Sequence, residues 1–305
     1  MIITIPIKNQ KDIGTPSDSV VVLGYFDGIH KGHQELFRVA NKAARKDLLP
    51  IVVMTFNESP KIALEPYHPD LFLHILNPAE RERKLKREGV EELYLLDFSS
   101  QFASLTAEEF FATYIKAMNA KIIVAGFDYT FGSNKKTAED LKDYFDGEVI
   151  IVPPVEDEKG KISSTRIRQA ILDGNVKEAG ELLGASLPSR GMVVHGNARG
   201  RTIGYPTANL VLLDRTYMPA DGVYVVDVEI QRQKYRAMAS VGKNVTFDGE
   251  EARFEVNIFD FNQDIYGETV MVYWLDRIRD MTKFDSVDQL VDQLKTDEEV
   301  ARNWS

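Results

Sequence analysis

Residues 20–33 read Val-Val-Val-Leu-Gly-Tyr-Phe-Asp-Gly-Ile-His-Lys-Gly-His, and they form the most informative stretch of this chain. Val20–Leu23 is an apolar run with the length of a buried strand, while residues 34–46 carry apolar side chains at helical spacing. Residues 24–33 are therefore expected to form a strand-to-helix turn. At such a turn the backbone N–H groups and the positive end of the helix favour an anion.

The composition of the turn suits a phosphate group. Gly24, Gly28 and Gly32 allow a sharp turn and a close approach of a bulky anion to the backbone. His30 and His33, two of only five histidines, add imidazoles to the same surface. We interpret the turn as a device that holds and neutralises nucleotide phosphates. The alternative, a helix cap beside core histidines, requires no ligand.

Around this turn, strand-like runs alternate with helical stretches through the first half of the chain. The expected strands are Val20–Leu23, Ile51–Phe56, Glu92–Leu96, Lys121–Ala125 and Glu148–Val152. The expected helices are 34–46, 78–88, 107–118, 137–146, Ser164–Leu172 and Val176–Leu183. This alternation predicts an α/β, Rossmann-like domain with a parallel sheet. Such sheets bind ligands beyond the carboxyl ends of their strands, where the turn would lie.

The pattern changes in the second half. Strand-like runs separated by turn residues follow one another at Met192–Val194, Gly222–Ile230, Tyr235–Val241, Ala252–Phe261 and Thr269–Leu275. Strands without intervening helices predict an antiparallel β-barrel or sandwich, and the apolar spacing within 286–303 predicts a C-terminal helix. We place the boundary in the segment 184–190, so the predicted domains are residues 1–184 and 185–305.

Composition narrows the classes of function. The chain has 305 residues, enough for two cores, and a net charge of −10 with neither half net basic, which argues against a nucleic-acid partner. No apolar run approaches the ~20 residues that span a membrane. The lack of cysteine excludes disulfides, thiolate metal sites and cysteine nucleophiles. Together with an N-terminus unlike a signal peptide, it fits a cytoplasmic protein.

Two further clusters in the first half fit phosphate chemistry. Residues 126–132, Gly-Phe-Asp-Tyr-Thr-Phe-Gly, follow an expected strand. The aromatic residues Phe127, Tyr129 and Phe131 suit the border of a flat ring, although packing in the core explains them equally well. Residues 161–168, Lys-Ile-Ser-Ser-Thr-Arg-Ile-Arg, offer hydroxyl groups and arginines at a helix start, for which an ordinary helix cap is the alternative.

The second half carries a separate candidate site. Residues 196–209, Gly-Asn-Ala-Arg-Gly-Arg-Thr-Ile-Gly-Tyr-Pro-Thr-Ala-Asn, suggest a flexible loop against phosphate. The spacing and Pro206 exclude a Walker loop, and a plain glycine-rich hairpin is the alternative. Along the strand 252–261, Glu255 shares a face with Asn257. A carboxylate directed toward a barrel interior or mouth needs a partner or a function, whereas an exposed glutamate on a solvent-facing strand needs neither.

Taken in order, these motifs resemble a known family. The runs 24–33, 125–132 and 162–168 resemble the FMN adenylyltransferase module of bacterial bifunctional riboflavin kinase/FAD synthetases, one of the HxGH nucleotidyltransferases. The runs 196–209, 219–224 (Pro-Ala-Asp-Gly-Val-Tyr) and 254–267 resemble the riboflavin kinase module of the same enzymes. The resemblance spans nearly the whole chain and implies a nucleotidyltransferase domain followed by a β-barrel kinase domain.

For the first module, the resemblance implies that His30 and His33 contact the phosphates of ATP. The other residues that it places at ATP are Gly24, Phe26, Asp27, Gly32, Ser164, Thr165 and Arg168. The residues that it places at the flavin are Asn57, Asp128, Tyr129 and Phe131. The chain departs from the family pattern at Ser59, where a histidine is usual. The phosphate of FMN is itself the nucleophile and is already ionised, so this reaction requires positioning and charge stabilisation rather than a base.

For the second module, the resemblance implies that Glu255 is the general base for the riboflavin 5′-hydroxyl, which is a poor nucleophile by itself. Mg²⁺ bound with ATP would be held by Thr207 and Asn209, and Gly200 and Arg201 would also contact ATP. Three departures fall in this module: Asn257 stands where histidine is common, Val245 replaces a usual proline, and Ala185-Ser186-Leu187 replaces a more typical Arg-Pro-Tyr linker.

The predicted function is therefore ATP-dependent phosphorylation of riboflavin to FMN and adenylylation of FMN to FAD. The expected partners are riboflavin, FMN, FAD, ATP, ADP and pyrophosphate, with no nucleic acid and no membrane, and with self-association as a further expectation. One alternative is a monofunctional nucleotidyltransferase with a regulatory β-domain. Another is a protein that senses or stores flavin. Both leave part of the set His30, His33 and Glu255 without a purpose.

Overall fold

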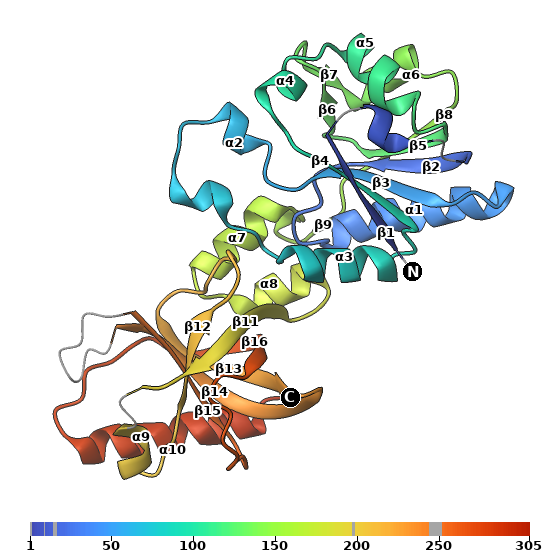
Figure 1. The fold of residues 1–305 in the computed structure, drawn as a ribbon. Coiled ribbons are helices and arrows are strands. Elements are labelled where there is room, and N and C mark those ends of the chain that lie inside the picture. Colours follow the sequence, from blue (N-terminus) through green and yellow to red (C-terminus); the bar gives the residue numbers. More distant parts are fainter. Residues whose placement is uncertain (1, 9, 15–16, 197–198, 244–251) are drawn as a thin grey trace. The chain divides into compact units, whose positions relative to one another are not determined.

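A computed structural model describes residues 2–8, 10–14, 17–196, 199–243 and 252–305. Contacts between residues divide the chain into two compact units, Met1–Ser163 and Ser164–Ser305, which Figure 1 colours blue to green and yellow to red. Two helices that precede the predicted boundary, Ser164–Leu172 and Val176–Leu183, group with the second unit. The boundary of the functional domains at residue 184 stays a prediction, because compactness does not assign these helices to either reaction.

The first unit is built on a six-stranded parallel sheet in the order β1-β4-β3-β2-β5-β8. Its strands are β1 (Ile3–Ile7), β2 (Ser19–Leu23), β3 (Ile51–Phe56), β4 (Glu92–Leu96), β5 (Ala120–Gly126) and β8 (Glu148–Val152). The parallel α/β domain predicted from the alternating pattern is confirmed. The strand β1 was not among those expected, and it pairs with β4 at the edge of the sheet.

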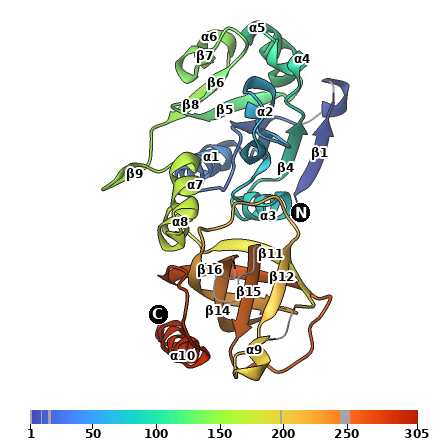
Figure 2. The same cartoon turned by 90° about the vertical axis from the view of Figure 1, so that its left-hand side faces the viewer.

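Helices cover both faces of this sheet (Figure 2). The helical segments are η1 (Gln10–Ile13), α1 (Lys31–Asp47), α2 (Lys61–Leu64), η2 (Pro69–Phe72), α3 (Pro78–Arg87), α4 (Ser100–Ala103), α5 (Ala107–Phe110), η3 (Phe111–Ile115), η4 (Ala138–Asp140) and α6 (Leu141–Tyr144). Val20 and Val22 pack with α1 and α3, whereas Val21 and Leu23 pack with α5, η3 and α6. The strand β2 is therefore buried on both sides, which explains its apolar sequence.

Two of the expected helices differ in detail. The stretch 107–118 begins with the capping box of Thr106 and Glu109 but continues from α5 into the π-helical turn η3. The stretch 137–146 forms only the short segments η4 and α6. Short hairpins complete the unit: β6 (Thr130–Phe131) with β7 (Lys136–Thr137), and β9 (Glu156–Asp157) with β10 (Gly160–Lys161).

The second unit opens with α7 (Ser164–Leu172) and α8 (Val176–Leu183) and continues as a closed antiparallel barrel. The barrel order is β11-β12-β15-β14-β13-β16. The strands are β11 (Leu187–Val194), β12 (Ala208–Leu212), β13 (Gly222–Ile230), β14 (Gln233–Lys243), β15 (Ala252–Ile258) and β16 (Thr269–Arg279), and the later helices are α9 (Arg199–Thr202) and α10 (Val287–Asn303). The predicted barrel and C-terminal helix are confirmed. The strand β12 was missed, because its first two residues end the glycine-rich candidate loop 196–209.

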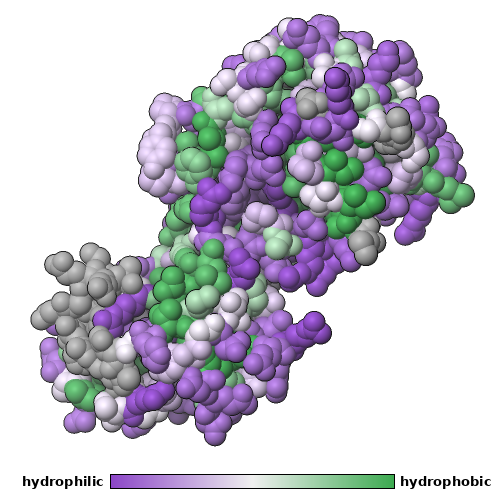
Figure 3. Space-filling model, viewed as in Figure 1, coloured by the Kyte–Doolittle hydropathy of each residue, from purple (hydrophilic) through white to green (hydrophobic). Residues whose placement is uncertain are grey.

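The two faces of the barrel wall hold different groups. Inside, the ring of Trp274 contacts the rings of Tyr224 and Phe254 at centroid distances of 5.2 and 5.3 Å. Outside, Val225 and Met238 pack against Ala301 of α10. The buried Asp297 of α10 also accepts hydrogen bonds from Arg279 of β16. The helix α10 therefore covers part of the outer face of the barrel. Hydrophilic residues cover most of the surface drawn in Figure 3.

Candidate active sites

The Gly24–His33 turn joins β2 to α1, as the sequence predicted. His30 is the N-cap residue of α1, and the backbone N–H of His33 donates to its Nδ1 atom at 3.3 Å. The two imidazole rings stack with centroids 3.7 Å apart and planes 17° apart. A Cβ atom on Gly32 would lie only 3.0 Å from the ring of His30. Glycine at position 32 therefore lets the stacked pair form at the start of the helix.

The stacked imidazoles carry no charge in the free protein at neutral pH. Burial, assisted by the charge of Lys161, lowers the pKa of His30 from 6.5 to about 4. Burial also lowers the pKa of His33 well below 6.5, and His30 and Lys161 act in the same direction. The expectation that the imidazoles neutralise phosphate charge therefore requires a proton to be taken up when the phosphate binds, since a nearby anion raises an imidazole pKa.

The positive charge near the histidines comes from lysines that the sequence analysis did not select. The Nζ atom of Lys161 is 2.6 Å from Oδ2 of Asp128 and 4.5 Å from the centre of the Phe127 ring. Lys84 of α3 is the other cation whose charge acts on His30, and burial lowers the pKa of Lys84 to about 8. Lys161 lies in the run 161–168, in which hydroxyl groups and arginines at the helix start, rather than this lysine, were predicted to bind phosphate.

Two of the residues expected at ATP have buried side chains. Phe26 is 1% exposed and packs edge-on against His33, with ring centroids 5.1 Å apart. Asp27 is 3% exposed and accepts a hydrogen bond from the N–H of Ile75 at 2.9 Å. Their side chains pack within the first unit, and the contact of these two residues with ATP stays a prediction.

The residues expected at the flavin divide into two groups. Phe131 is 6% exposed and belongs to the hydrophobic core, and Tyr129 packs against the same core. The core alternative therefore holds for Phe131, and Phe127, with 41% exposure, is the aromatic residue of this run with an open ring. Asp128 pairs with Lys161, and Asn57 donates to Asp97 at 2.8 Å. Because Asn57 follows β3 and Asp128 follows β5, they lie at the same carboxyl edge as the histidines.

Ser164, Thr165 and Arg168 lie in α7, at the start of the second compact unit. The guanidinium of Arg168 is 6.0 Å from the centre of the Tyr217 ring. A helix does begin at Ser164, which confirms the local structure predicted for this run. The expected approach of these three residues to the ATP phosphates stays a prediction.

The second unit brings Thr207 and Glu255 together. The Oγ1 hydroxyl of Thr207 is 3.2 Å from Oε2 of Glu255, while Nη1 of Arg253 is 3.4 Å from Oε1. Cross-strand pairing places Asn209 opposite Glu255. The Nδ2 amide of Asn257 donates to the carbonyl of Pro206 at 2.6 Å. These contacts gather the predicted kinase residues at the junction of β12 and β15.

Glu255 lies on the outer face of the barrel wall. Its neighbours Phe254 and Val256 are buried, and the ring of Phe254 stacks on Trp274 inside the barrel. The carboxylate is thus not directed into the barrel interior, because alternate side chains of a strand face opposite sides. It is also not a free solvent-facing glutamate, since its side chain is 26% exposed and has two polar partners.

The glycine-rich segment is partly described. Gly200 and Arg201 lie in the short helix α9, and the Nη2 group of Arg201 donates to the Tyr266 hydroxyl at 3.4 Å. A Cβ atom on Gly200 would overlap the carbonyl oxygen of Tyr205, so glycine is required there. Residues 197–198 and 244–251, with the departure at Val245, lie outside the described residues.

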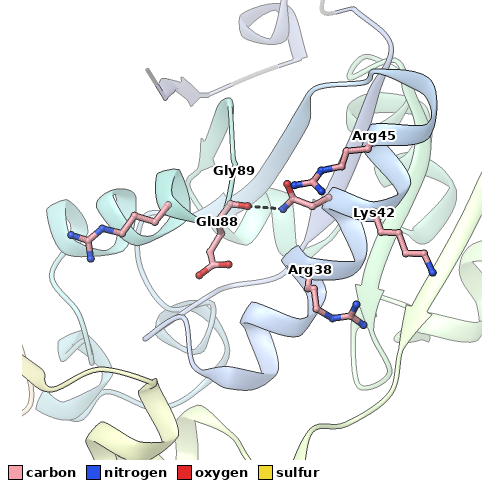
Figure 4. A pocket seen from close by; sticks show the side chains of 7 residues that line it. Arg38, Lys42, Arg45, Glu88 and Gly89 are labelled. Carbon is pink, nitrogen blue, oxygen red and sulfur yellow. Dashed lines mark hydrogen bonds between the residues drawn. The ribbon is translucent and has the colours of Figure 1, made fainter.

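A separate hollow of about 700 Å³ lies on the first unit (Figure 4). Its lining residues are Arg38, Asn41, Lys42, Arg45, Arg87, Glu88 and Gly89. Arg45 and Arg87 occupy the last turns of α1 and α3, where cations compensate the helix dipole, and Arg38 pairs with Glu35 at 2.6 Å. The basic character of this hollow follows from two helix ends and requires no ligand.

Within the described residues, no three or more His, Cys, Asp or Glu side chains are grouped as a metal site. None of the helices in the described part of the chain is both long and apolar enough to cross a membrane.

Comparison with known proteins assigns both units. Residues 12–166 match the family model described as FAD synthetase, and residues 183–305 match that of riboflavin kinase. A protein of Listeria monocytogenes named bifunctional riboflavin kinase/FMN adenylyltransferase is 38% identical over 95% of this chain and 94% of its own length. A protein of the same name from Bacillus subtilis is 37% identical, with coverages of 93% and 91%.

A crystal structure from Streptococcus pneumoniae, described as a macrolide-efflux protein, is 98% identical to this chain. It superposes with a TM-score of 0.96 and covers 100% of both chains, which confirms the fold. Efflux is the activity stated for that protein, whereas two family models and the curated relatives agree on flavin phosphorylation and adenylylation. The chain therefore belongs to the family of bifunctional riboflavin kinases/FMN adenylyltransferases, with its FAD synthetase domain N-terminal and its riboflavin kinase domain C-terminal.

Proposed function

We propose that the two reactions of this family proceed at two separate sites on the chain. FMN is adenylylated at the Gly24–His33 turn, and riboflavin is phosphorylated beside Thr207 and Glu255. One observation carries this proposal: the stacked histidine pair and the Thr207–Glu255 pair lie in different compact units. The histidine pair would serve adenylyl transfer, and the Thr207–Glu255 pair would serve the kinase reaction.

In adenylyl transfer, an oxygen of the FMN phosphate attacks the α-phosphorus of ATP, and the bond from this phosphorus to the oxygen of the leaving pyrophosphate breaks. The nucleophile is ionised near neutral pH, so no residue has to remove a proton from it. The backbone at the start of α1 binds the phosphates, and the histidines donate hydrogen bonds to the charge that develops. Lys161, next to Asp128, adds a permanent positive charge on the same side.

Three further features belong to this site in our proposal. Asn57 and Asp128, at the carboxyl edge of the sheet, contact the flavin nucleotide, and the exposed ring of Phe127 borders the flavin in place of Phe131. Contact with ATP phosphate is the role that we keep for Ser164, Thr165 and Arg168, at the start of α7. Gly24 and Gly32 keep the backbone open to the same phosphates, which requires glycine at both positions.

In the kinase reaction, the riboflavin 5′-hydroxyl attacks the γ-phosphorus of ATP while Glu255 accepts the hydroxyl proton, and ADP leaves. Arg253 and Thr207 each engage one oxygen of the Glu255 carboxylate, which orients the base. Asn257 holds the segment that precedes Thr207 through its bond to Pro206. Gly200 and Arg201 lie in the segment that we assign to ATP phosphate contact.

The oxygen donors at the kinase site fit Mg²⁺, which prefers oxygen ligands and usually combines one or two protein groups with substrate phosphates. The Thr207 hydroxyl already lies within 3.2 Å of a carboxylate oxygen, and Asn209 stands opposite that carboxylate across the strand pair. Thr207 and Asn209 would therefore hold Mg²⁺ together with ATP. When bound, the ion would neutralise phosphate charge that these uncharged side chains cannot offset.

The two-site proposal is tested by separating the activities. The chain is incubated with ATP, Mg²⁺ and either riboflavin or FMN, and the flavins are resolved by chromatography. Glu255→Gln should lose FMN formation but convert supplied FMN to FAD. The pair His30→Ala and His33→Ala should form FMN but little FAD, because a donor to transition-state charge typically contributes ~3–4 kcal/mol.

The activity that each variant retains serves as its own folding control. If both variants lose both activities while remaining folded, the reactions share residues and the two-site proposal is wrong.

The predicted cytoplasmic location rests on the composition and on the use of ATP. Self-association stays a prediction that sedimentation of the purified chain would check.

A further inference from the structure

A group of polar residues, three of them buried, contacts the phosphate-binding turn. Its members, which we call the support cluster, are Tyr25, Asp27, Glu58, His74 and Arg81. They come from three separate parts of the first unit: the turn itself, the segment after β3, and the segment 74–81, which runs into α3. Asp27, His74 and Arg81 are only 3%, 5% and 5% exposed. None of them is needed by the reaction scheme given above.

The turn in front of this cluster has a strained backbone. Phe26, Gly28 and Ile29 all have positive φ angles, of 59°, 93° and 48°. For a β-branched residue such as Ile29 this is an unusual conformation. Non-glycine residues in this region cost about 1–3 kcal/mol each and persist only where the surroundings enforce them. The turn therefore depends on contacts that hold it in place.

The support cluster provides such contacts through Tyr25 and Asp27. The hydroxyl of Tyr25 lies 3.3 Å from Nδ1 of His74, and Nε2 of His74 lies 3.2 Å from the Glu58 carboxylate. Asp27 receives the N–H of Ile75 at 2.9 Å. The turn is thus bonded at two neighbouring positions to the 74–75 segment, which lies far away in sequence.

Arg81 adds a buried positive charge to the same place. Its guanidinium lies 5.9 Å from the centre of the Tyr25 ring. Burial lowers the pKa of Arg81, and the charges of Tyr25, Asp27 and Glu58 oppose that shift. A buried cation is costly unless acidic groups stay close to it. Arg81 therefore favours the one arrangement in which Asp27 and Glu58 remain on its side, and Asp27 belongs to the turn.

We propose that the support cluster holds the Tyr25–Ile29 backbone in its phosphate-binding conformation, and that Arg81 and His74 are positioning residues for adenylyl transfer. This inference rests on the proposed function of the turn. A shift of the turn by a fraction of an ångström moves the backbone N–H groups and the histidines relative to the α-phosphate. Such a shift affects turnover more than it affects substrate binding, because transition-state contacts depend more strongly on geometry.

The test compares neighbouring arginines of the same helix. Arg81→Met removes the buried charge, and Arg83→Met removes an exposed one whose side chain is 53% exposed and pairs with Glu80. Arg81→Lys restores the charge, and Tyr25→Phe deletes only the hydroxyl that contacts His74. For each variant, kcat and KM for ATP are measured for FMN adenylylation at 25 °C. Kinase activity and hydrogen exchange of α1 are measured in the same samples.

We expect Arg81→Met to lower kcat by about tenfold or more while KM for ATP changes less than about threefold. Tyr25→Phe should lower kcat by a smaller factor, Arg81→Lys should recover part of the loss, and Arg83→Met should behave like the unaltered chain. Kinase activity should be unchanged throughout, and α1 should remain protected from exchange.

The inference is wrong if Arg81→Met and Tyr25→Phe both keep kcat within about twofold of the unaltered chain. It is also wrong if kcat falls only in proportion to lost protection of α1, because the cluster then contributes stability alone. A different result separates the underlying proposal: if His30→Ala with His33→Ala still adenylylates FMN normally, the turn is not the adenylyl-transfer site, whatever the Arg81 variants do.

Discussion

The imidazole rings of His30 and His33 are stacked 3.7 Å apart at the N-terminus of α1, and burial keeps both uncharged at neutral pH. Two protonated rings at this separation would repel each other. The pair is therefore uncharged while no anion is bound, and it gains positive charge only when an anion binds beside it. We test this pair with two predictions, and we add one for Lys161 and one for Asp297 of the second unit.

The first prediction concerns stability and pH. The pKa of His30 is about 4 in the folded chain and 6.5 when exposed, so the unfolded chain binds more protons between these values. Above pH 6.5 the histidine is uncharged in both states, so its titration does not change the free energy of unfolding. As the pH falls toward 4, the unfolded chain takes up the proton first, and the free energy of unfolding decreases. The protection factors of the α1 amides, which correct the exchange rates for the pH dependence of intrinsic exchange, should therefore fall as the pH decreases over this range, and His30→Gln with His33→Gln should flatten the dependence. An unchanged pH dependence in that double variant would contradict the prediction.

The second prediction concerns proton uptake. Since bound phosphate raises the pKa of a neighbouring imidazole, ATP binding at pH 6.5 should draw protons from the buffer. Calorimetric titration in buffers of different ionisation enthalpy measures this uptake. The unaltered chain should take up protons, and His30→Gln with His33→Gln should take up fewer. Equal uptake by both proteins would show that groups other than these two histidines are responsible.

The third prediction concerns Lys161. Replacing Lys161 by Gln removes a cation that lies 2.6 Å from Asp128 and acts on both histidines. We expect kcat/KM for adenylyl transfer to fall by about tenfold or more, because one charged donor at the transferring phosphate is lost. Kinase activity should not change. Lys159→Gln, two residues away and exposed, is the matched control, and a loss of equal size there would reduce the effect to overall surface charge.

The fourth prediction concerns the attachment of α10 to the barrel. Asp297 is fully buried and accepts hydrogen bonds from Arg279 through both carboxylate oxygens, so Asp297→Ala leaves the Arg279 guanidinium, whose side chain is 19% exposed, without its carboxylate partner. This should destabilise the second unit by about 3 kcal/mol or more. Trp274 and Trp304, the only two tryptophans, both lie in that unit, so fluorescence during urea unfolding reports it alone. Asp292→Ala on the exposed side of α10 should cost less than about 1 kcal/mol.

Much of the fold was accessible from local patterns. Apolar runs such as Ile51–Phe56 and Glu92–Leu96 predicted strands with the observed bounds, because a strand buried on both faces must be apolar along its length. The strands β1 and β12 were missed. Ile3–Ile7 is a short edge strand, and Ala208–Leu212 begins in the last two residues of a glycine-rich run that indicates a loop by composition.

The candidate sites divide in the same way. The sequence placed His30 and His33 on a strand-to-helix turn and singled out Glu255, since residue type and spacing are local properties. Burial is not a local property. Phe127 and Phe131 look alike in the run 126–132, yet one ring is open and the other is packed in the core. The same contrast separates Arg81 from Arg83, because helical position alone did not show which arginine faces the turn.

By itself, then, the sequence determined the fold class of both halves, most of their strands and helices, and the family, and it predicted the principal reacting groups. Only the tertiary structure decided the charge of those groups and what holds them. Tyr25 meets His74 across 49 residues, and Thr207 meets Glu255 across 48. A pKa or a strained turn depends on every group packed around it, and those groups come from distant parts of the chain that no local pattern connects.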